Sequence, residues 1–262
     1  MSLNILNKSF LLVRRVWSFA TSRGSGSNKS SKSNSRPKRN DRNRTYYDLP
    51  MLASYPRSGS NWIRYFVELI SGRPTPGKVI LVEGDDFYME RSHFAHSEMD
   101  SYRMTVLLLR DYRECILRHQ LAFWQSVQDV KAFLSDESLK HPPSLYVDNI
   151  IAFDALEGEK HVIYYEDMVS DPEDFFRHLA VILKLDPIRT EDFIDNLDSH
   201  YEESVARYKS NGHDSVTSSS KKLNYHTEEN LSNDQAKSFD DYYFSRYPEI
   251  AEKYLSRYRI SI

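Results

Sequence analysis

Short apolar runs alternate with segments of helical periodicity through the middle of the chain. The apolar runs have the length of buried strands and lie near residues 51–55, 105–109 and 161–165. Apolar residues recur at helical spacing in four further segments, near 60–71, 112–126, 146–156 and 172–184. Strands that alternate with helices are typical of a parallel sheet covered by helices. The pattern therefore predicts a three-layer α/β sandwich with a central parallel sheet.

Beyond about residue 189 the pattern is mostly helical, and Asp234–Ser245 and Pro248–Arg257 are the expected closing elements. The chain has 262 residues, 40% of them hydrophobic, which suffices for one substantial core and leaves little for a second domain. We therefore expect a single domain over residues 46–262. Residues 1–45 are expected to form a disordered basic leader, because Ser, Asn, Gly, Lys and Arg dominate from residue 21 onward.

The formal net charge of -3 conceals an uneven distribution. Residues 1–44 contain eleven Lys or Arg and one acid, whereas the rest of the chain has 24 basic and 37 acidic residues. Such a leader also fits an organelle transit peptide or a weak tether to anionic membranes. Its apolar stretch, Phe10–Trp17, is too short to span a membrane and contains two arginines. Nothing else in the chain suggests a nucleic-acid partner, and none is expected.

The cysteine and metal-ligand content adds two exclusions. A single cysteine, Cys115, rules out an internal disulfide framework and suits a reducing compartment such as the cytoplasm. No His, Cys or carboxylate cluster has convincing metal-ligand spacing, so no metal is expected. The sequence does not indicate an oligomeric state.

Residues 55–62, with the sequence YPRSGSNW, form the most informative segment of the chain. An apolar run precedes them and a helical pattern follows, so the predicted order is strand, tight loop, helix. We expect Ser60 or Asn61 to cap the helix, whose free backbone N–H groups then face the loop. Gly59 permits close backbone approach, and Arg57 adds a permanent positive charge. The segment therefore predicts a phosphate-binding loop.

This loop lacks the lysine of the GxxxxGK[ST] pattern, which argues against ATP and magnesium. It resembles the first motif of the sulfotransferases that use 3′-phosphoadenosine 5′-phosphosulfate (PAPS), approximately YPKSGTxW. The resemblance implies that the donor contacts six consecutive residues, with the last against the adenine: Arg57, Ser58, Gly59, Ser60, Asn61 and Trp62. Arg57 stands where many members have lysine and where the protein-tyrosine branch has arginine. Arginine supplies hydrogen bonds and charge, but no proton for the leaving group.

A second segment, residues 104–111 with the sequence MTVLLLRD, is an apolar run that ends in a charged pair. Ligands gather at such carboxyl ends in parallel sheets. It resembles the family's strand followed by R(D/N)P, in which the arginine, and a serine eight positions later, grip the donor's 3′-phosphate. Arg110 matches that arginine, whereas Tyr112 replaces the proline and Arg118 occupies the serine position. Two interpretations of Arg118 stay open, a second phosphate ligand or a solvated helix residue.

Two later segments extend the resemblance. Residues 161–168, HVIYYEDM, are similar to the family's YEDM strand, which implies that Tyr165 contacts the adenine. Residues 218–227 fit the basic, flexible loop with which members close the donor site, and they imply Lys221 and Lys222 as phosphate partners. A solvated polar linker is the alternative for this last segment.

Transfer of a sulfuryl group to a hydroxyl also requires a base. Histidine suits this role at neutral pH, because its ordinary pKa is about 6.5. Residues 90–96 read ERSHFAH, and their Arg-Ser-His resembles the family's K(T/S)H. The resemblance implies His93 as the general base, with His96 as the second candidate.

Taken together, the motifs imply a P-loop NTPase-like sulfotransferase fold. They also imply in-line transfer from PAPS to the hydroxyl or amine of a small-molecule, lipid or carbohydrate acceptor. Two alternatives stay open. One is a nucleotide-dependent phosphotransferase or kinase on a related fold, and the other is a catalytically inactive nucleotide-binding protein, which the departures at Tyr112 and Arg118 allow.

Overall fold

The structure of the chain is a computed structural model that describes residues 48–77, 79–94, 97–121, 129–139, 141–210 and 231–259. Several predictions lie outside these residues. They are the disordered leader, the second candidate base His96, and the phosphate partners Lys221 and Lys222.

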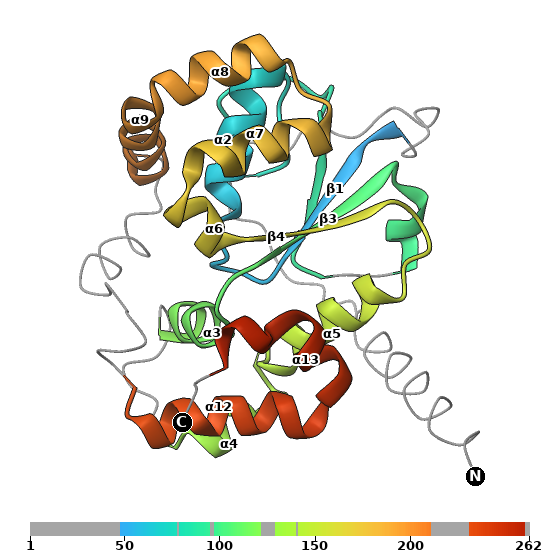
Figure 1. The fold of residues 1–262 in the computed structure, drawn as a ribbon, viewed down its shortest axis with the longest axis vertical. Coiled ribbons are helices and arrows are strands. Elements are labelled where there is room, and N and C mark those ends of the chain that lie inside the picture. The colour runs from blue at the N-terminus through green and yellow to red at the C-terminus, as the bar shows by residue number, and fades with distance from the viewer. Residues whose placement is uncertain are drawn as a thin grey trace, which may run out of the picture. The chain divides into compact units, whose positions relative to one another are not determined.

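Four parallel strands form the central sheet, and they confirm the predicted α/β fold (Figure 1). They are β1 (Pro50–Ser54), β2 (Glu90–Ser92), β3 (Met104–Leu109) and β4 (Lys160–Tyr164), in the spatial order β2-β1-β3-β4. The register pairs Leu52 with Arg91 on one side and with Val106 on the other, and Val106 with His161. Because all pairs are parallel, the four carboxyl ends share one edge of the sheet. The chain leaves β1 toward β2 and then crosses to β3, so the topological switch point lies between β1 and β3.

The strands alternate their side chains between two apolar layers, as a strand period of two requires. Leu52, Val106 and Leu108 face one layer, which contains α2 (Ser60–Ser71), α7 (Pro172–Leu183) and α8 (Pro187–Asp195). Ala53 and Leu107 face the other, which contains α3 (Tyr112–Leu121), α4 (Val130–Leu134), α5 (Ser144–Asp154), α12 (Asn233–Arg246) and α13 (Pro248–Leu255). Figure 1 shows these two groups of helices on opposite faces of the sheet. The remaining described elements are η3 (Ser97–Ser101), α6 (Tyr165–Ser170), α9 (Leu197–Ser210) and η4 (Ser256–Tyr258).

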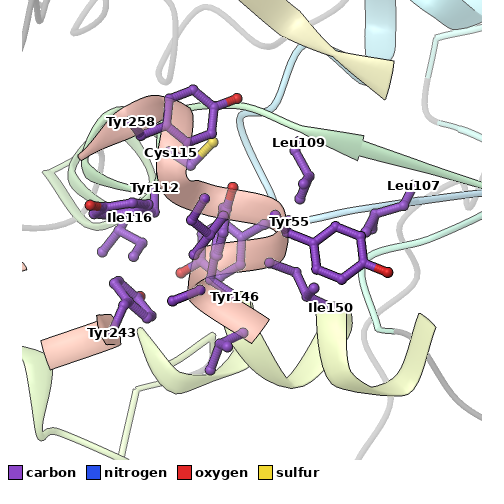
Figure 2. Close-up of a cluster of buried hydrophobic side chains, with 14 of the residues drawn as sticks. Tyr55, Leu107, Leu109, Tyr112, Cys115, Ile116, Tyr146, Ile150, Tyr243 and Tyr258 are labelled. Carbon is purple, nitrogen blue, oxygen red and sulfur yellow. The ribbon is translucent and has the colours of Figure 1, made fainter. Parts of the chain in front are cut away.

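Tyrosine is the most frequent residue in the buried layer that contains α3 and α5, and Figure 2 shows Tyr55, Tyr112, Tyr146, Tyr243 and Tyr258 within it. Two of the tyrosine hydroxyls connect a loop to a helix. Tyr146 donates to the carbonyl of Arg110 at 2.6 Å, directly after β3. Tyr243 in α12 donates to the carbonyl of Pro143 at 2.8 Å. A buried tyrosine contributes apolar ring area and still needs a partner for its hydroxyl, so each of these rings fixes a backbone position as it fills the core.

The predicted elements agree with the structure to within one or two residues for β1, β3, β4, α2, α5, α7, α12 and α13, and for the start of α3. β2 was not predicted, because its three residues, Glu90–Ser92, form a short half-buried edge strand without an apolar run. Tyr165, expected at the end of a strand, is instead the first residue of α6. Within the described part of the chain, no helix has the length and apolarity needed to cross a membrane.

Candidate functional site

The shared edge of the sheet brings four loops together. Residues 55–59 follow β1, His93 follows β2, Arg110 follows β3, and Tyr165 follows β4. These are the positions that the sequence motifs singled out, and parallel pairing explains why these four separate segments meet here.

The loop between β1 and α2 has an unusual backbone. Arg57 and Gly59 both have positive φ, 71° and 93° respectively. Gly59 is the N-cap residue of α2, and no side chain caps the helix. The prediction that Ser60 or Asn61 provides the cap is therefore wrong, because the left-handed turn at Gly59 starts the helix one residue earlier and makes Ser60 its first residue. The first backbone N–H groups of α2 have no side-chain cap, and the loop before them contains two residues with positive φ. Such a backbone forms a concavity of the kind that binds anions.

Two further contacts fix this loop to its surroundings. The Ser58 hydroxyl donates to the carbonyl of Tyr55 at 2.8 Å, and it lies 3.3 Å from the sulfur of Cys115 in α3. A Cβ atom at Gly59 would lie 2.6 Å from Cδ2 of Tyr165. Glycine is required here both for its positive φ and because the tyrosine ring lies against it.

Three arginines converge beside the loop. Nη1 of Arg110 donates to the carbonyl of Arg57 at 3.2 Å, so the two residues share one site. Burial, and the nearby charges of Arg118 and Arg110, lower the pKa of Arg57. Glu114 in α3 accepts from Nε of Arg118 at 2.7 Å and lies 3.5 Å from Nη2 of Arg110. The charges that act on Arg57 are therefore positive, and such surroundings favour an anionic ligand.

Arg118 thus has features of both open interpretations. It forms an ion pair within α3, as a helix residue would, and its charge also reaches Arg57 in the loop. Its role as a phosphate ligand stays a prediction.

Tyr165 lies between the loop and Arg110. The guanidinium carbon of Arg110 sits 3.9 Å from the centre of the Tyr165 ring, in a cation–π contact. The neighbouring Glu166 accepts from the backbone N–H of Asp111 at 2.9 Å and from the hydroxyl of Tyr258 at 2.7 Å. Sequence reasoning missed Glu166, although the YEDM motif contains it. Its carboxylate links the ends of β3 and β4 to the last described segment of the chain.

The residue that departs from R(D/N)P has a structural role. Tyr112 is fully buried, and its hydroxyl donates to Asp240 in α12 at 2.5 Å. Next to it, Arg113 pairs with Asp111 at 2.9 Å and with Asp240 at 3.4 Å, and it also donates to the carbonyl of Tyr258. Tyrosine in place of proline therefore anchors the C-terminal helices to the start of α3.

Hydrogen bonds from the ring and to the backbone carbonyl of His93 fix this residue at the same edge of the sheet. Its Nδ1 lies 2.9 Å from the carbonyl oxygen of Ser54, and its carbonyl accepts from Nδ2 of Asn149 at 2.9 Å. A carbonyl only accepts, so Nδ1 carries the proton and Nε2 has the lone pair. Burial lowers the pKa of His93 to about 4, and the charges of Arg91 and His141 act in the same direction. The imidazole is therefore neutral at physiological pH.

Two other histidines lie beside it, and neither was identified from the sequence. The rings of His93 and His141 are 6.5 Å apart, and Nδ1 of His141 lies 2.9 Å from Nε2 of His119 in α3. Since His141 precedes α5 and His119 lies in the last turn of α3, only the packing of these helices brings them together. No sequence spacing could have indicated this pair.

Trp62 lies among aromatic side chains on the other face of the sheet. Its ring stacks on that of Tyr65, with 5.4 Å between the ring centres. The ring centres of Phe176, Phe193 and Tyr201 lie 5.5, 5.6 and 5.8 Å from that of Trp62. Tyr201, in α9, is 57% exposed. The aromatic cluster therefore reaches the surface, and the adenine contact predicted for Trp62 stays a prediction.

Groups of three or more His, Cys, Asp or Glu side chains that could hold a metal were not found among the described residues. The guanidinium groups of Arg57, Arg110 and Arg118 suit anions by their chemistry.

No family model and no curated protein matches the chain. Among solved structures, the chain is similar to the crystal structure of mouse sulfotransferase SULT7A1 complexed with PAP. The TM-score is 0.48 and the sequence identity 14%, over 80% of this chain and 88% of that one. A likeness at this level assigns no function, and the parallel α/β fold rests on the strand pairing itself.

Proposed function

We propose that the chain is a sulfotransferase that moves a sulfuryl group from PAPS to the hydroxyl or amine of a small-molecule, lipid or carbohydrate acceptor. One observation carries the proposal. Nη1 of Arg110 donates to the backbone carbonyl of Arg57 at 3.2 Å, beside the helix N-terminus that no side chain caps. The arginines and the helix N-terminus are two groups that can bind phosphate at one loop. They suit a donor with phosphates on both sides of its ribose, a feature that separates PAPS from ATP.

In this proposal the charges divide between the two ends of the donor. Arg57 and the N-terminus of α2 bind the 5′-phosphosulfate, where charge develops as the sulfur–oxygen bond lengthens. Arg110 and Arg118 bind the 3′-phosphate and orient the donor without contact with the reacting atom. The aromatic rings of Trp62 and Tyr165 are the adenine contacts of the proposal.

His93 is the proposed general base. The acceptor oxygen attacks sulfur, its proton passes to Nε2 of His93, and the bond between sulfur and the bridging phosphate oxygen breaks. The leaving 3′,5′-adenosine bisphosphate (PAP) keeps that electron pair, and Arg57 stabilises the resulting negative charge by hydrogen bonding. The support for this role is that Nδ1 donates to the Ser54 carbonyl, which leaves the lone pair on Nε2.

The proposal is tested by incubation of the full chain with sulfur-labelled PAPS and a panel of phenols, sugars and lipid headgroups. We expect label in at least one acceptor with wild type. We expect none above background with His93→Ala, which should still bind PAP. Transfer of phosphate from magnesium-ATP in place of sulfuryl transfer would support the kinase alternative.

A further inference from the structure

Glu114 is a carboxylate in the middle of the arginine cluster. It lies in the first turn of α3, and 10% of its side chain is exposed. It forms ion pairs with Arg118 at 2.7 Å and with Arg110 at 3.5 Å. Both arginines are donor ligands in the proposed function, so Glu114 already pairs with the groups that a phosphate would need.

The other carboxylates near the site have different partners. Asp111 pairs with Arg113 at 2.9 Å, and Glu166 accepts from a backbone N–H and from a tyrosine hydroxyl. Arg57 has no carboxylate partner among the described residues, and the charges that act on it come from Arg110 and Arg118. Among these carboxylates, Glu114 is therefore the one that pairs directly with two of the three guanidinium groups.

We propose that Glu114 is an internal counter-ion that pairs with Arg110 and Arg118 when no donor is bound, and that the donor's 3′-phosphate must displace it. The inference rests on the proposed function, and it assigns to Glu114 the control of donor affinity. A phosphate monoester brings up to two negative charges and three acceptor oxygens, against one charge and two oxygens for a carboxylate. The phosphate therefore displaces the Glu114 carboxylate from the two arginines, but it binds next to this carboxylate, whose negative charge repels it.

Glu114→Gln separates this role from a simple helix ion pair. Glutamine keeps the size and one acceptor oxygen but removes the charge. We expect PAP to bind about tenfold more tightly to the variant than to wild type in calorimetric titrations of the full chain. The melting temperature without ligand is expected to fall, because the arginines lose their counter-ion. Equal or weaker binding of PAP by the variant would overturn the inference.

Glu173→Gln is the matched control. Glu173 pairs with Arg177 at 3.3 Å, also across one helical turn, and both residues are exposed on α7. This variant should bind PAP as wild type does. If Glu114→Gln does not fold, Glu114→Asp takes its place, since the shorter side chain keeps the charge but reaches the arginines less well. About threefold tighter PAP binding is then expected, and no gain contradicts the inference.

A second ligand separates failure of this inference from failure of the proposed function. Adenosine 5′-monophosphate lacks the 3′-phosphate, so Glu114→Gln should not tighten its binding. An equal gain for both ligands would show that the 3′-phosphate is not the competing group, and it would overturn the inference. If wild type itself binds PAP no better than adenosine 5′-monophosphate, the proposed function fails as well.

Discussion

The lowered pKa of His93 predicts how stability depends on pH, and this prediction can be tested without a substrate. Its pKa is about 4 in the folded chain, against an ordinary value of about 6.5. Between these two pH values the unfolded chain binds more protons than the folded chain, so the free energy of unfolding falls as the pH is lowered from 6.5 to 4. The two pKa values differ by about 2.5, and since a difference of one corresponds to about 1.4 kcal/mol, the folded chain loses about 3 kcal/mol of stability over this window.

His93→Gln should remove this contribution, because glutamine does not titrate but can still donate to the Ser54 carbonyl. The assay is urea denaturation of wild type and variant from pH 4 to 7.5, with His178→Gln, on the exposed side of α7, as the control for loss of a histidine. The difference between wild type and His93→Gln should grow in favour of the variant on acidification. A flat difference, or a wild type that gains stability relative to the variant at low pH, would refute the burial of a neutral imidazole.

Three further predictions concern the loop and the start of α3. Arg110→Ala should weaken PAP binding by roughly 10- to 100-fold, whereas Arg57→Ala should mainly lower kcat; the same pure affinity defect in both variants contradicts their separate roles. Gly59→Ala should cost about 1–2 kcal/mol of unfolding free energy from its positive φ, with a further loss as Tyr165 is displaced, and should abolish PAP binding. Gly72→Ala is the control, because Gly72 has φ 65° and an added Cβ would lie 3.8 Å from its nearest neighbour, Nη1 of Arg189. This variant should lose only the stability that the positive φ accounts for, and it should still bind PAP. Equal stability losses in the two variants would rule out the contact with the Tyr165 ring. Tyr112→Phe should lower the free energy of unfolding by about 1–2 kcal/mol and leave PAP affinity within about twofold of wild type, as measured by denaturation and calorimetry; a large loss of affinity would mean that this tyrosine acts in the site and not as an anchor.

The fold was predictable because its signals are local. Apolar runs of strand length marked β1, β3 and β4, and helical spacing marked α2, α5 and α7. Once parallel pairing was inferred, Arg57 and Arg110 were expected at the same edge, and the structure brings them into contact. β2 escaped prediction because three half-buried residues, Glu90–Ser92, contain no apolar pattern.

Sequence reasoning missed Glu114, although four residues separate it from Arg110 and from Arg118, a spacing that places the three side chains on one helix face. The rest of the site depends on tertiary packing. The pairing of His119 with His141 requires α3 and the start of α5 to meet. The cap of α2 was predicted wrongly because serine and asparagine are the preferred caps, whereas the left-handed backbone at a glycine determined where this helix starts.

The most direct test of the central claim is a thermal-shift comparison of the full chain with PAP and with magnesium-ATP. The claim is that the loop after β1 and Arg110 bind one adenosine that carries phosphates on both sides of its ribose. We expect PAP to raise the melting temperature by several degrees at concentrations where magnesium-ATP has little effect. Stabilisation by magnesium-ATP with no response to PAP would contradict the claim.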